Sequence, residues 1–334
     1  MRVITKRVER ARAWARRRGR RVHEAHGLVL MYHRVATPVA DPWQLAVAPQ
    51  TFDAQLRALR EAFDVVPLRE LRENLRTGRH ARPVAAVTFD DGYLDNLTVA
   101  KPILECHAVP ATVFVITGFT GRTEGFWWDR LAHAVLGNQP LPSRLEIPGE
   151  PAGFEFADPD LADAGDRGQR ARRRLHDQLW AWLCDRPDAA KLRALERLEH
   201  WHGRAPAHDP GGRPMSGDEL RQLVAGGLVD VGAHTATHPR LSRLSRDAQA
   251  TEIATSRADC RAILGHDPVA FSYPNGDYAP ETVELVRGAG FALACNSRQD
   301  LAWAGDDALQ IPRISVKEET GAALSRRLRW GWLA

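Results

Sequence analysis

The stretch VAAVTFDDGYLDN, residues 84–96, indicates how this chain folds. Its first half is a β-rich apolar run, which ends at two adjacent carboxylates, Asp90 and Asp91, directly before Gly92. A strand that ends in this way puts charged side chains at the rim of a sheet, while the strand behind them stays buried. Neighbouring strand residues point to opposite sides, so the two acids can have different roles. Because Asp-Gly is also common in turns, the stretch taken alone fits a plain polar turn equally well.

Similar apolar runs recur along the chain. They lie at 27–35, 85–91, 111–116, 228–234, 269–274, 291–295 and 309–316. Most are continuous rather than alternating, which is typical of strands that are buried on both faces. Helical stretches lie between them, with Thr51, Ser216 and Ser245 at expected N-caps and Gly265 and Gly290 at expected helix ends. This alternation predicts a parallel α/β architecture, and seven runs fit either a distorted or incomplete barrel or an open sheet.

One segment, 137–213, departs from this pattern. It begins with a Pro/Gly-rich loop, continues as a basic and then apolar helix, and ends in a turn-rich stretch. We interpret it as a helical cap inserted into a single domain that spans 27–320. A basic N-terminal helix or arm, 1–26, precedes this domain, and an Arg/Trp tail, 321–334, follows it.

The charge is concentrated at the N-terminus. The chain of 334 residues has an ordinary globular composition, 44% hydrophobic and 26% charged, and a formal net charge of +4. Residues 1–27 contain nine Arg and one Lys against two Glu, a charge of +8, so the rest of the chain carries −4. With Trp330 and Trp332 at the other end, the termini suit contact with an anionic membrane surface or a solvated arm. No motif that reads nucleic acid is recognisable, so we expect no such partner.

The expected location is cytoplasmic. No apolar run approaches the ~18–20 residues that cross a bilayer, and no secretory signal is recognisable. Four scattered cysteines without C-x-x-C spacing suit a reducing compartment. Peripheral attachment at the inner membrane face through the two termini is compatible with this expectation.

A second informative stretch, LVDVGAHTATHPRLSRLS, covers 228–245. A predicted strand ends at His234, and His238 follows four residues later. A histidine pair at this spacing alone also fits one core residue and one surface residue. Combined with a strand-end aspartate, however, it supplies two nitrogens and one oxygen. This is the three-ligand set of a catalytic Zn²⁺ site that leaves a position open for water or substrate.

These two stretches resemble a known family. TFDDG at 88–92 and HTATH at 234–238 are similar to the first two motifs of the polysaccharide deacetylases, carbohydrate esterase family 4, which share the NodB homology domain. The resemblance implies a distorted (β/α)7 barrel and a metal-dependent hydrolase that removes N-acetyl groups from carbohydrates. It also implies that Asp90 is the catalytic base and that Asp91, His234 and His238 bind the metal, Zn²⁺ first, with Co²⁺ or Ni²⁺ as alternatives.

The sequence departs from the commonest family pattern at the general acid. Many relatives carry this acid as a histidine near the C-terminus, whereas the final predicted strand, QIPRISV, has none. Instead, LMYHRV places His33 at the end of the first strand. This resembles the branch that acts on poly-N-acetylglucosamine and other exopolysaccharides, and it implies that His33 is the acid. A hydrogen-bonded core histidine is the alternative.

The third family motif also departs from the pattern, since Arg-x-Pro-Tyr-Gly appears here as Ser-Tyr-Pro-Asn-Gly at 272–276. The resemblance implies that Tyr273 and Asn275 belong to one wall of the groove and that the Asn275 amide holds the oxyanion. Because the family's arginine is replaced, Arg313 in the last strand takes over its orienting role, or it is a plain surface residue.

Two sugar-related expectations complete the sequence-based hypothesis. Trp128, in FWWDRL, is a candidate platform for sugar stacking, and aromatic packing fits it equally well. The substrate is an N-acetylated glycan or a lipid-linked saccharide, from which acetate is released. The alternatives are hydrolysis of a non-acetyl amide, such as a formamide on a lipid sugar, and a non-catalytic glycan-binding relative.

Overall fold

The computed structural model describes residues 25–77, 82–137, 141–149, 152–201 and 209–330. The basic arm expected at 1–26 lies almost wholly outside these residues, as do the last four residues of the chain. The described residues divide into two compact units. Unit 1 comprises the described part of Met1–Thr37, with Leu45–Gly121 and Pro214–Ala334, and unit 2 comprises Pro38–Gln44 and Arg122–Arg213.

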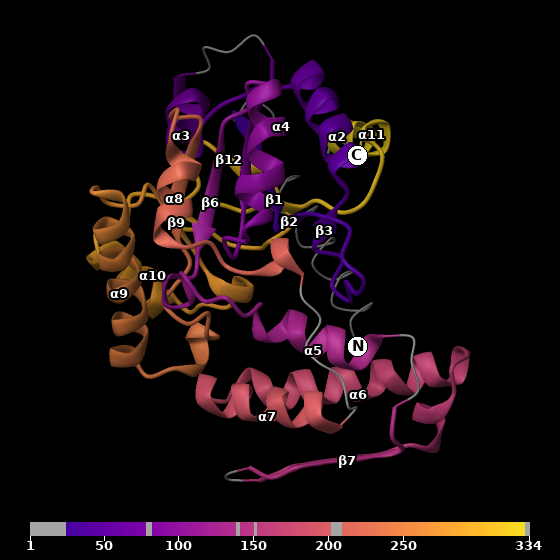
Figure 1. Cartoon of the computed structure of the whole chain (residues 1–334). Helices are drawn as coiled ribbons and strands as arrows, with labels where there is room; N and C mark the ends of the chain where they lie inside the picture. Colours follow the sequence, from indigo (N-terminus) through magenta and orange to yellow (C-terminus); the bar gives the residue numbers. More distant parts are fainter. Residues whose placement is uncertain (1–24, 78–81, 138–140, 150–151, 202–208, 331–334) are drawn as a thin grey trace. The chain divides into compact units, whose positions relative to one another are not determined.

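Unit 1 is built on a parallel barrel (Figure 1). Its seven strands are β1 (His26–Tyr32), β5 (Val84–Phe89), β6 (Ala111–Val115), β9 (Val229–Ala233), β10 (Phe271–Ser272), β11 (Ala294–Cys295) and β13 (Ile314–Ser315). Each pairs in parallel with the next, from β1 through β5, β6, β9 and β10 to β11. The bridge Cys295↔Ile311 and the pair Leu30↔Ile314 then lead back to β1 and close the ring. The predicted distorted seven-stranded barrel is therefore confirmed, and the open-sheet alternative is wrong.

The strand pairs are of unequal length. β5 pairs with β1 along its full length, from Gly27↔Val84 to Tyr32↔Phe89, whereas β9 and β10 are joined at Phe271↔Ala233. Shorter strands lie alongside. They are β4 (Asp64–Val65) next to β5, β12 (Ala302–Trp303) antiparallel to β1, and the small pair β2 (Arg34–Val35) with β3 (Ala46–Val47). The barrel is distorted because its neighbouring strands pair over unequal lengths.

Helices enclose the barrel strands, and Figure 1 shows α8, α9 and α10 outside the sheet. The helices of unit 1 are α2 (Pro49–Ala62), α3 (Leu68–Thr77), α4 (Lys101–Cys106), α8 (Gly217–Val224), α9 (Arg246–Leu264), α10 (Pro280–Gly288) and α11 (Gly321–Trp330). A π-helical turn, η1 (Asn96–Ala100), leads into α4, and short 3₁₀ turns lie at η2 (Thr117–Phe119), η5 (Leu241–Arg243) and η6 (Pro274–Gly276). The strands and the inner helix faces bury two apolar clusters.

The predicted helix ends are mostly confirmed. Ser216 and Ser245 cap α8 and α9 through their side chains, and α9 stops at Gly265, which has a φ of 79°. The expected cap at Thr51 is wrong, because α2 already begins at Pro49, which is preorganised for a first helical turn. The Thr51 hydroxyl donates to Glu318 instead, at 2.5 Å.

The expected Arg/Trp tail, 321–334, is described as far as residue 330. Its described part is helix α11, in which Leu324 and Leu328 are buried in the core. The loop before α11 is tied to α2, because the Gln55 side-chain amide donates to the carbonyls of Lys317 and Glu319. The apolar residues spaced four apart in this segment therefore form a buried helix face rather than a free end.

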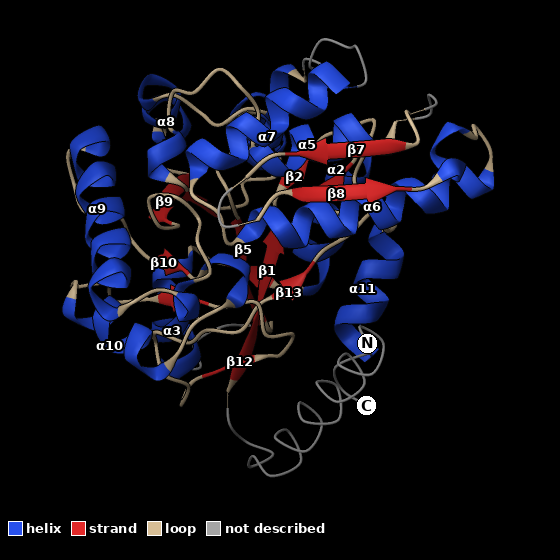
Figure 2. Cartoon of the chain, turned by 90° about the horizontal axis from the view of Figure 1, so that it is seen from below, coloured by secondary structure: helices blue, strands red, loops and turns tan. Residues whose placement is uncertain are grey.

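Unit 2 contains the predicted insertion and extends beyond it. Its elements are α5 (Trp127–Leu136), β7 (Arg144–Ile147), β8 (Phe154–Ala157), η3 (Pro159–Ala162), α6 (Asp166–Cys184), α7 (Asp188–Trp201) and η4 (Pro210–Gly212). Figure 2 shows β7 and β8 as an antiparallel hairpin. Leu175, Leu179 and Leu183 of α6 are buried along one helix face. The role of this unit as a cap stays a prediction. Among the described residues, none of the helices has both the length and the hydropathy needed to cross a membrane.

Candidate metal centre and acid–base site

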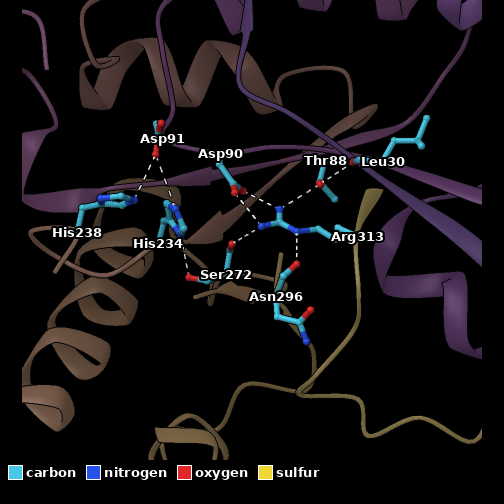
Figure 3. A network of polar contacts seen from close by, with 9 residues as sticks. All are labelled: Leu30, Thr88, Asp90, Asp91, His234, His238, Ser272, Asn296 and Arg313. Carbon is cyan, nitrogen blue, oxygen red and sulfur yellow. Dashed lines mark hydrogen bonds and ion pairs between the residues drawn. The ribbon is translucent and has the colours of Figure 1, made fainter. Parts of the chain in front are cut away.

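The two aspartates follow strand β5 and turn to different partners, as predicted, although Asp91 already lies outside the strand with a positive φ. Asp90 pairs with Arg313, while Asp91 faces His234 and His238 (Figure 3). Asp91 has a φ of 73°, and Gly92 after it has a φ of 78°. A Cβ atom at Gly92 would lie 2.8 Å from Cγ1 of Val115, so this position requires glycine for space as well as for its backbone angle.

Three side chains converge into a set that could hold a metal ion. Oδ1 of Asp91 lies 3.7 Å from Nε2 of His234 and 3.6 Å from Nε2 of His238. The potential ligand atoms of the three residues all lie within 4.8 Å of one another. Two imidazoles and one carboxylate are the ligand chemistry of a catalytic zinc-type site. The structure therefore brings together the three residues that the sequence motifs predict as metal ligands.

A hydrogen bond to Nδ1 of His234 leaves its Nε2 available as a metal ligand. Its Nδ1 lies 2.7 Å from the backbone carbonyl oxygen of Ser272, which can only accept a proton. The ring proton is therefore held on Nδ1, and the lone pair of Nε2 faces Asp91. Burial lowers the pKa of His234, although the negative charge of Asp90 opposes this effect. A buried, neutral imidazole with a free Nε2 is the form that binds a metal.

Backbone strain is concentrated at this site. In the part of the chain that the structure describes, six non-glycine residues have a positive φ, and four of them lie here: Asp91, Thr235, His238 and Asn275. Thr235 is β-branched, for which a φ of 64° is unfavourable. Its Oγ1 accepts a hydrogen bond of 3.0 Å from the backbone N–H of His238, which fixes the loop between the two histidines. Such conformations persist where the surrounding contacts over-determine them.

Arg313 uses its whole guanidinium group around Asp90. Its two terminal nitrogens donate to the two oxygens of Asp90, each at 2.7 Å. The remaining N–H groups donate to Thr88 Oγ1, Ser272 Oγ and the carbonyl of Asn296, so all five donors are used. Both members of the pair are buried, Asp90 at 4% exposure and Arg313 at 1%. Arg313 is therefore not a plain surface residue, and its role in orienting the base stays a prediction.

This pair fixes the charge of Asp90. Burial is the largest single influence and would raise the pKa of its carboxyl group, but the Arg313 guanidinium, His234 and His33 together outweigh burial. The pKa of Asp90 is therefore held far below its usual range. Burial would in turn lower the pKa of Arg313, but Asp90 holds it above its usual value. The buried pair is ionised throughout the physiological pH range.

His33 follows strand β1 and is half-buried. Its carbonyl accepts a hydrogen bond of 2.9 Å from the side-chain amide of Asn96, and its charge influences the pKa of Asp90. The next residue, Arg34, forms a buried ion pair with Asp95 at 2.8 Å. Sequence reasoning missed Asp95 and Asn96 as supports of this segment. The sequence signal that could have identified them is their position at the end of the stretch 84–96, three and four residues after Gly92.

The structure places the three predicted groove residues in different surroundings. Asn275 is exposed and has a φ of 58°, on the turn after β10. Tyr273 needs a correction, because its side chain is only 1% exposed, packs in the core and donates its hydroxyl to the carbonyl of Leu309 at 2.9 Å. Trp128 belongs to unit 2, where it is buried and stacked on Phe126 with ring centroids 4.7 Å apart. Aromatic packing therefore occupies one face of the Trp128 ring.

Comparison with known proteins agrees with this geometry. A family described as "Polysaccharide deacetylase" matches residues 77–140 and 198–294, which include Asp90, Asp91, His234 and His238. The putative polysaccharide deacetylase YxkH of Bacillus subtilis (strain 168) is 26% identical over 127 residues. This match covers 36% of the chain and 44% of the relative's length, so less than half of that relative is compared.

Several solved structures share the fold. IcaB from Ammonifex degensii has a TM-score of 0.58 at 22% identity, over 90% of this chain and 96% of that one. The Streptococcus pyogenes deacetylase PplD, solved in complex with acetate, has a TM-score of 0.57 at 20% identity, over 90% and 97%. A de-N-acetylase from Aggregatibacter actinomycetemcomitans has a TM-score of 0.55 at 14% identity, over 90% and 99%. With the family match and the convergent Asp–His–His site, the chain belongs to the polysaccharide deacetylase family.

Proposed function

We propose that this protein is a metal-dependent hydrolase that cleaves the acetamide of an N-acetylated sugar and releases acetate. The observation that carries the proposal is that two adjacent aspartates, Asp90 and Asp91, have different surroundings. Asp91 faces two histidine nitrogens at 3.6–3.7 Å, while its neighbour Asp90 is held ionised by Arg313. A site that needs both a ligand and a base from adjacent residues would be arranged in this way.

The donor set fits a divalent metal ion. Asp91, His234 and His238 would hold it, and the Ser272 carbonyl keeps Nε2 of His234 available. A bound divalent metal polarises a carbonyl oxygen and lowers the pKa of a water molecule from 15.7 towards ~7. Zn²⁺ suits two imidazoles and a carboxylate, with Co²⁺ and Ni²⁺ as alternatives.

The residues of the chain would move the protons. Asp90 would take the proton of the attacking water, and its two hydrogen bonds to Arg313 would keep the carboxylate oriented. Because the pKa of Asp90 is held below its usual range, its carboxylate is ionised at neutral pH and has a lone pair available for this proton. The backbone N–H of Asn275 would donate to the carbonyl oxygen as negative charge develops there.

His33 would complete the reaction as the general acid. When the carbon–nitrogen bond breaks, the departing nitrogen takes up a proton and leaves as the amine of the sugar, while the acyl group leaves as acetate. An imidazole near neutral pKa suits this transfer. The electrostatic effect of His33 on Asp90 supports this assignment, since it places the two groups within reach of one another's charge.

The family and the sequence support the proposed substrate class. An N-acetylated glycan or a lipid-linked sugar is proposed, and hydrolysis of a formamide on a lipid sugar is the second candidate. Peripheral attachment at the inner membrane face, which favours a lipid-linked substrate, rests on terminal residues that lie largely outside the described part of the chain. A membrane-fractionation experiment on the full chain tests it, and a protein found wholly in the supernatant would contradict it.

A product assay tests the reaction. Purified full-length protein loaded with Zn²⁺ is incubated with N-acetylated glycans and lipid-linked sugars, and acetate and formate are measured. We expect acetate release by the wild type and a reduction of kcat by about 10²–10⁴-fold in Asp90→Asn and in His33→Gln. Formate as the sole product would favour the second candidate. Neither product from any substrate would favour a glycan-binding relative.

Two matched controls separate chemistry from folding. Asp247→Asn and His266→Gln make the same exchanges at exposed positions of unit 1 and should keep wild-type turnover. Metal content is measured in every variant. Asp90→Asn and His33→Gln should keep the metal, because neither residue belongs to the ligand set. Loss of metal in His33→Gln, or unchanged turnover, would refute its role as the acid.

A further inference from the structure

A carboxylate of helix α9, that of Glu252, reaches the loop that carries the two histidines. Its Oε2 accepts hydrogen bonds of 2.9 Å from the backbone N–H groups of both Ala236 and Thr237. Its Oε1 accepts a third, of 2.6 Å, from the hydroxyl of Thr237. These partners are the residues between His234 and His238, so Glu252 binds the centre of the segment that joins them.

The same helix face holds a neighbouring loop. Asp259 lies seven residues after Glu252, two turns along α9, and therefore on the same side of the helix. Its carboxylate accepts a hydrogen bond of 2.7 Å from the hydroxyl of Thr117, in the loop after β6. That loop donates back to the histidine loop, from Thr117 N to the carbonyl of Thr235 at 3.2 Å and from Gly118 N to that of Ala236 at 2.8 Å.

The histidine loop needs such support because of its conformation. Thr235 and His238 both have positive φ angles, 64° and 60°, which a β-branched residue and a histidine rarely adopt. Without external partners, this backbone would relax towards more favourable angles, and the imidazole of His238 would move with it. His238 is also the more exposed of the two histidines, with 14% of its side chain exposed against 2% for His234. Its position therefore depends more on the loop than on packing.

We propose that Glu252 is a positioning residue for the metal centre, which holds the loop 235–237 so that Nε2 of His238 stays directed at Asp91. The proposal rests on the proposed function, since it takes Asp91, His234 and His238 as metal ligands. Glu252 makes no contact with the ligand atoms. Its effect on metal binding passes through the three hydrogen bonds to the loop.

The test is the metal affinity of the full-length protein, measured for Zn²⁺ by competition with a chromophoric chelator. Glu252→Ala removes all three acceptors and should weaken Zn²⁺ binding by about 10–100-fold, the range for residues that orient metal ligands. Glu252→Gln should restore most of the affinity, because its carbonyl oxygen can accept from both backbone N–H groups and its amide can donate to the Thr237 hydroxyl. Glu284→Gln, an exposed exchange on α10, is the matched control and should bind as the wild type does.

Thermal unfolding of the metal-free variants distinguishes positioning from general stabilisation. A lower melting temperature of Glu252→Ala with unchanged Zn²⁺ affinity would overturn the proposal, as would equal weakening by Glu252→Ala and Glu252→Gln. If Glu252→Ala does not fold, Thr237→Val decides, since it removes one of the three bonds in a nearly isosteric way. Affinity reduced about 3-fold or more would support the proposal, and unchanged affinity would overturn it. A wild type that binds no metal would instead refute the proposed function itself.

Discussion

Replacing Arg313 by methionine should cost the fold about 3–5 kcal/mol at neutral pH. The exchange keeps a long side chain but removes the guanidinium group, and with it both hydrogen bonds to Asp90 at 2.7 Å. Asp90, which is 4% exposed, is then left as a buried charge without its cation. Removal of one partner from a buried pair has this cost because the desolvation penalty of the other partner is no longer compensated. The free energy of unfolding is measured by urea denaturation of the metal-free protein.

The loss should depend on pH in a defined direction. In the wild type the folded pKa of Asp90 lies below the unfolded value of ~3.9, so its contribution is present above that pH and disappears as the pH falls through the folded pKa. In Arg313→Met, burial is the dominant influence and should raise the folded pKa above ~3.9. The variant should therefore gain stability as Asp90 takes up a proton. The gap between the two proteins should widen from about pH 4 to about pH 7.

Two further variants make this reasoning refutable. Arg287→Met breaks the exposed ion pair with Asp307 and should cost less than about 1 kcal/mol. Asp90→Asn combined with Arg313→Met removes the buried charge and should recover a large part of the stability lost in Arg313→Met. A loss below about 1 kcal/mol at pH 7, or a loss of equal size at pH 4 and pH 7, would refute the assignment of the Asp90 charge to Arg313.

Three other perturbations test the metal site and the barrel. Chelation with EDTA should abolish acetate release and lower the melting temperature, and both should return with Zn²⁺; a melting temperature that does not respond to metal would contradict the site formed by Asp91 and the two histidines. Gly118→Ala should weaken Zn²⁺ binding measured by chelator competition, because its Cβ would lie 2.6 Å from the carbonyl oxygen of Ala236; equal affinity would show that the loop can yield. Leu324→Ala should cost about 2–5 kcal/mol in urea denaturation, since this side chain of α11 is 1% exposed, whereas a cost near zero would show that α11 is dispensable for the core.

The strands and the ligands were predictable because their signals are local. Continuous apolar runs specify strands buried on both faces, and each of the seven predicted runs covers one of the barrel strands to within one residue. Asp91, His234 and His238 follow strand ends, and the carboxyl ends of parallel strands meet at one rim. A strand-end motif therefore specifies position in space as well as chemistry.

The supports of the site could not be predicted in the same way. Glu252 is one of several charged residues on a surface helix, and its identity as a loop acceptor depends on how α9 is rotated against the barrel. Asp95 was visible in the opening stretch, but its pairing with Arg34 requires β1 and β5 to be adjacent. Tyr273 was misplaced because a motif gives the path of the backbone, whereas the side chain followed the core. Tertiary packing decides such contacts, and local patterns do not encode it.

Because the barrel strands pair over unequal lengths, the segments that carry Asp90 and Arg313 are held by different numbers of strand contacts. Asp90 and Asp91 stand at the end of β5, which pairs along its length with β1. Arg313 comes from the short closing segment, which is joined by the bridge Cys295↔Ile311 on one side and by β13 on the other. Segments with few ladder bonds open locally more often than long strands do. A local opening of this segment would withdraw the guanidinium from Asp90 while leaving the carboxylate in place at the end of β5.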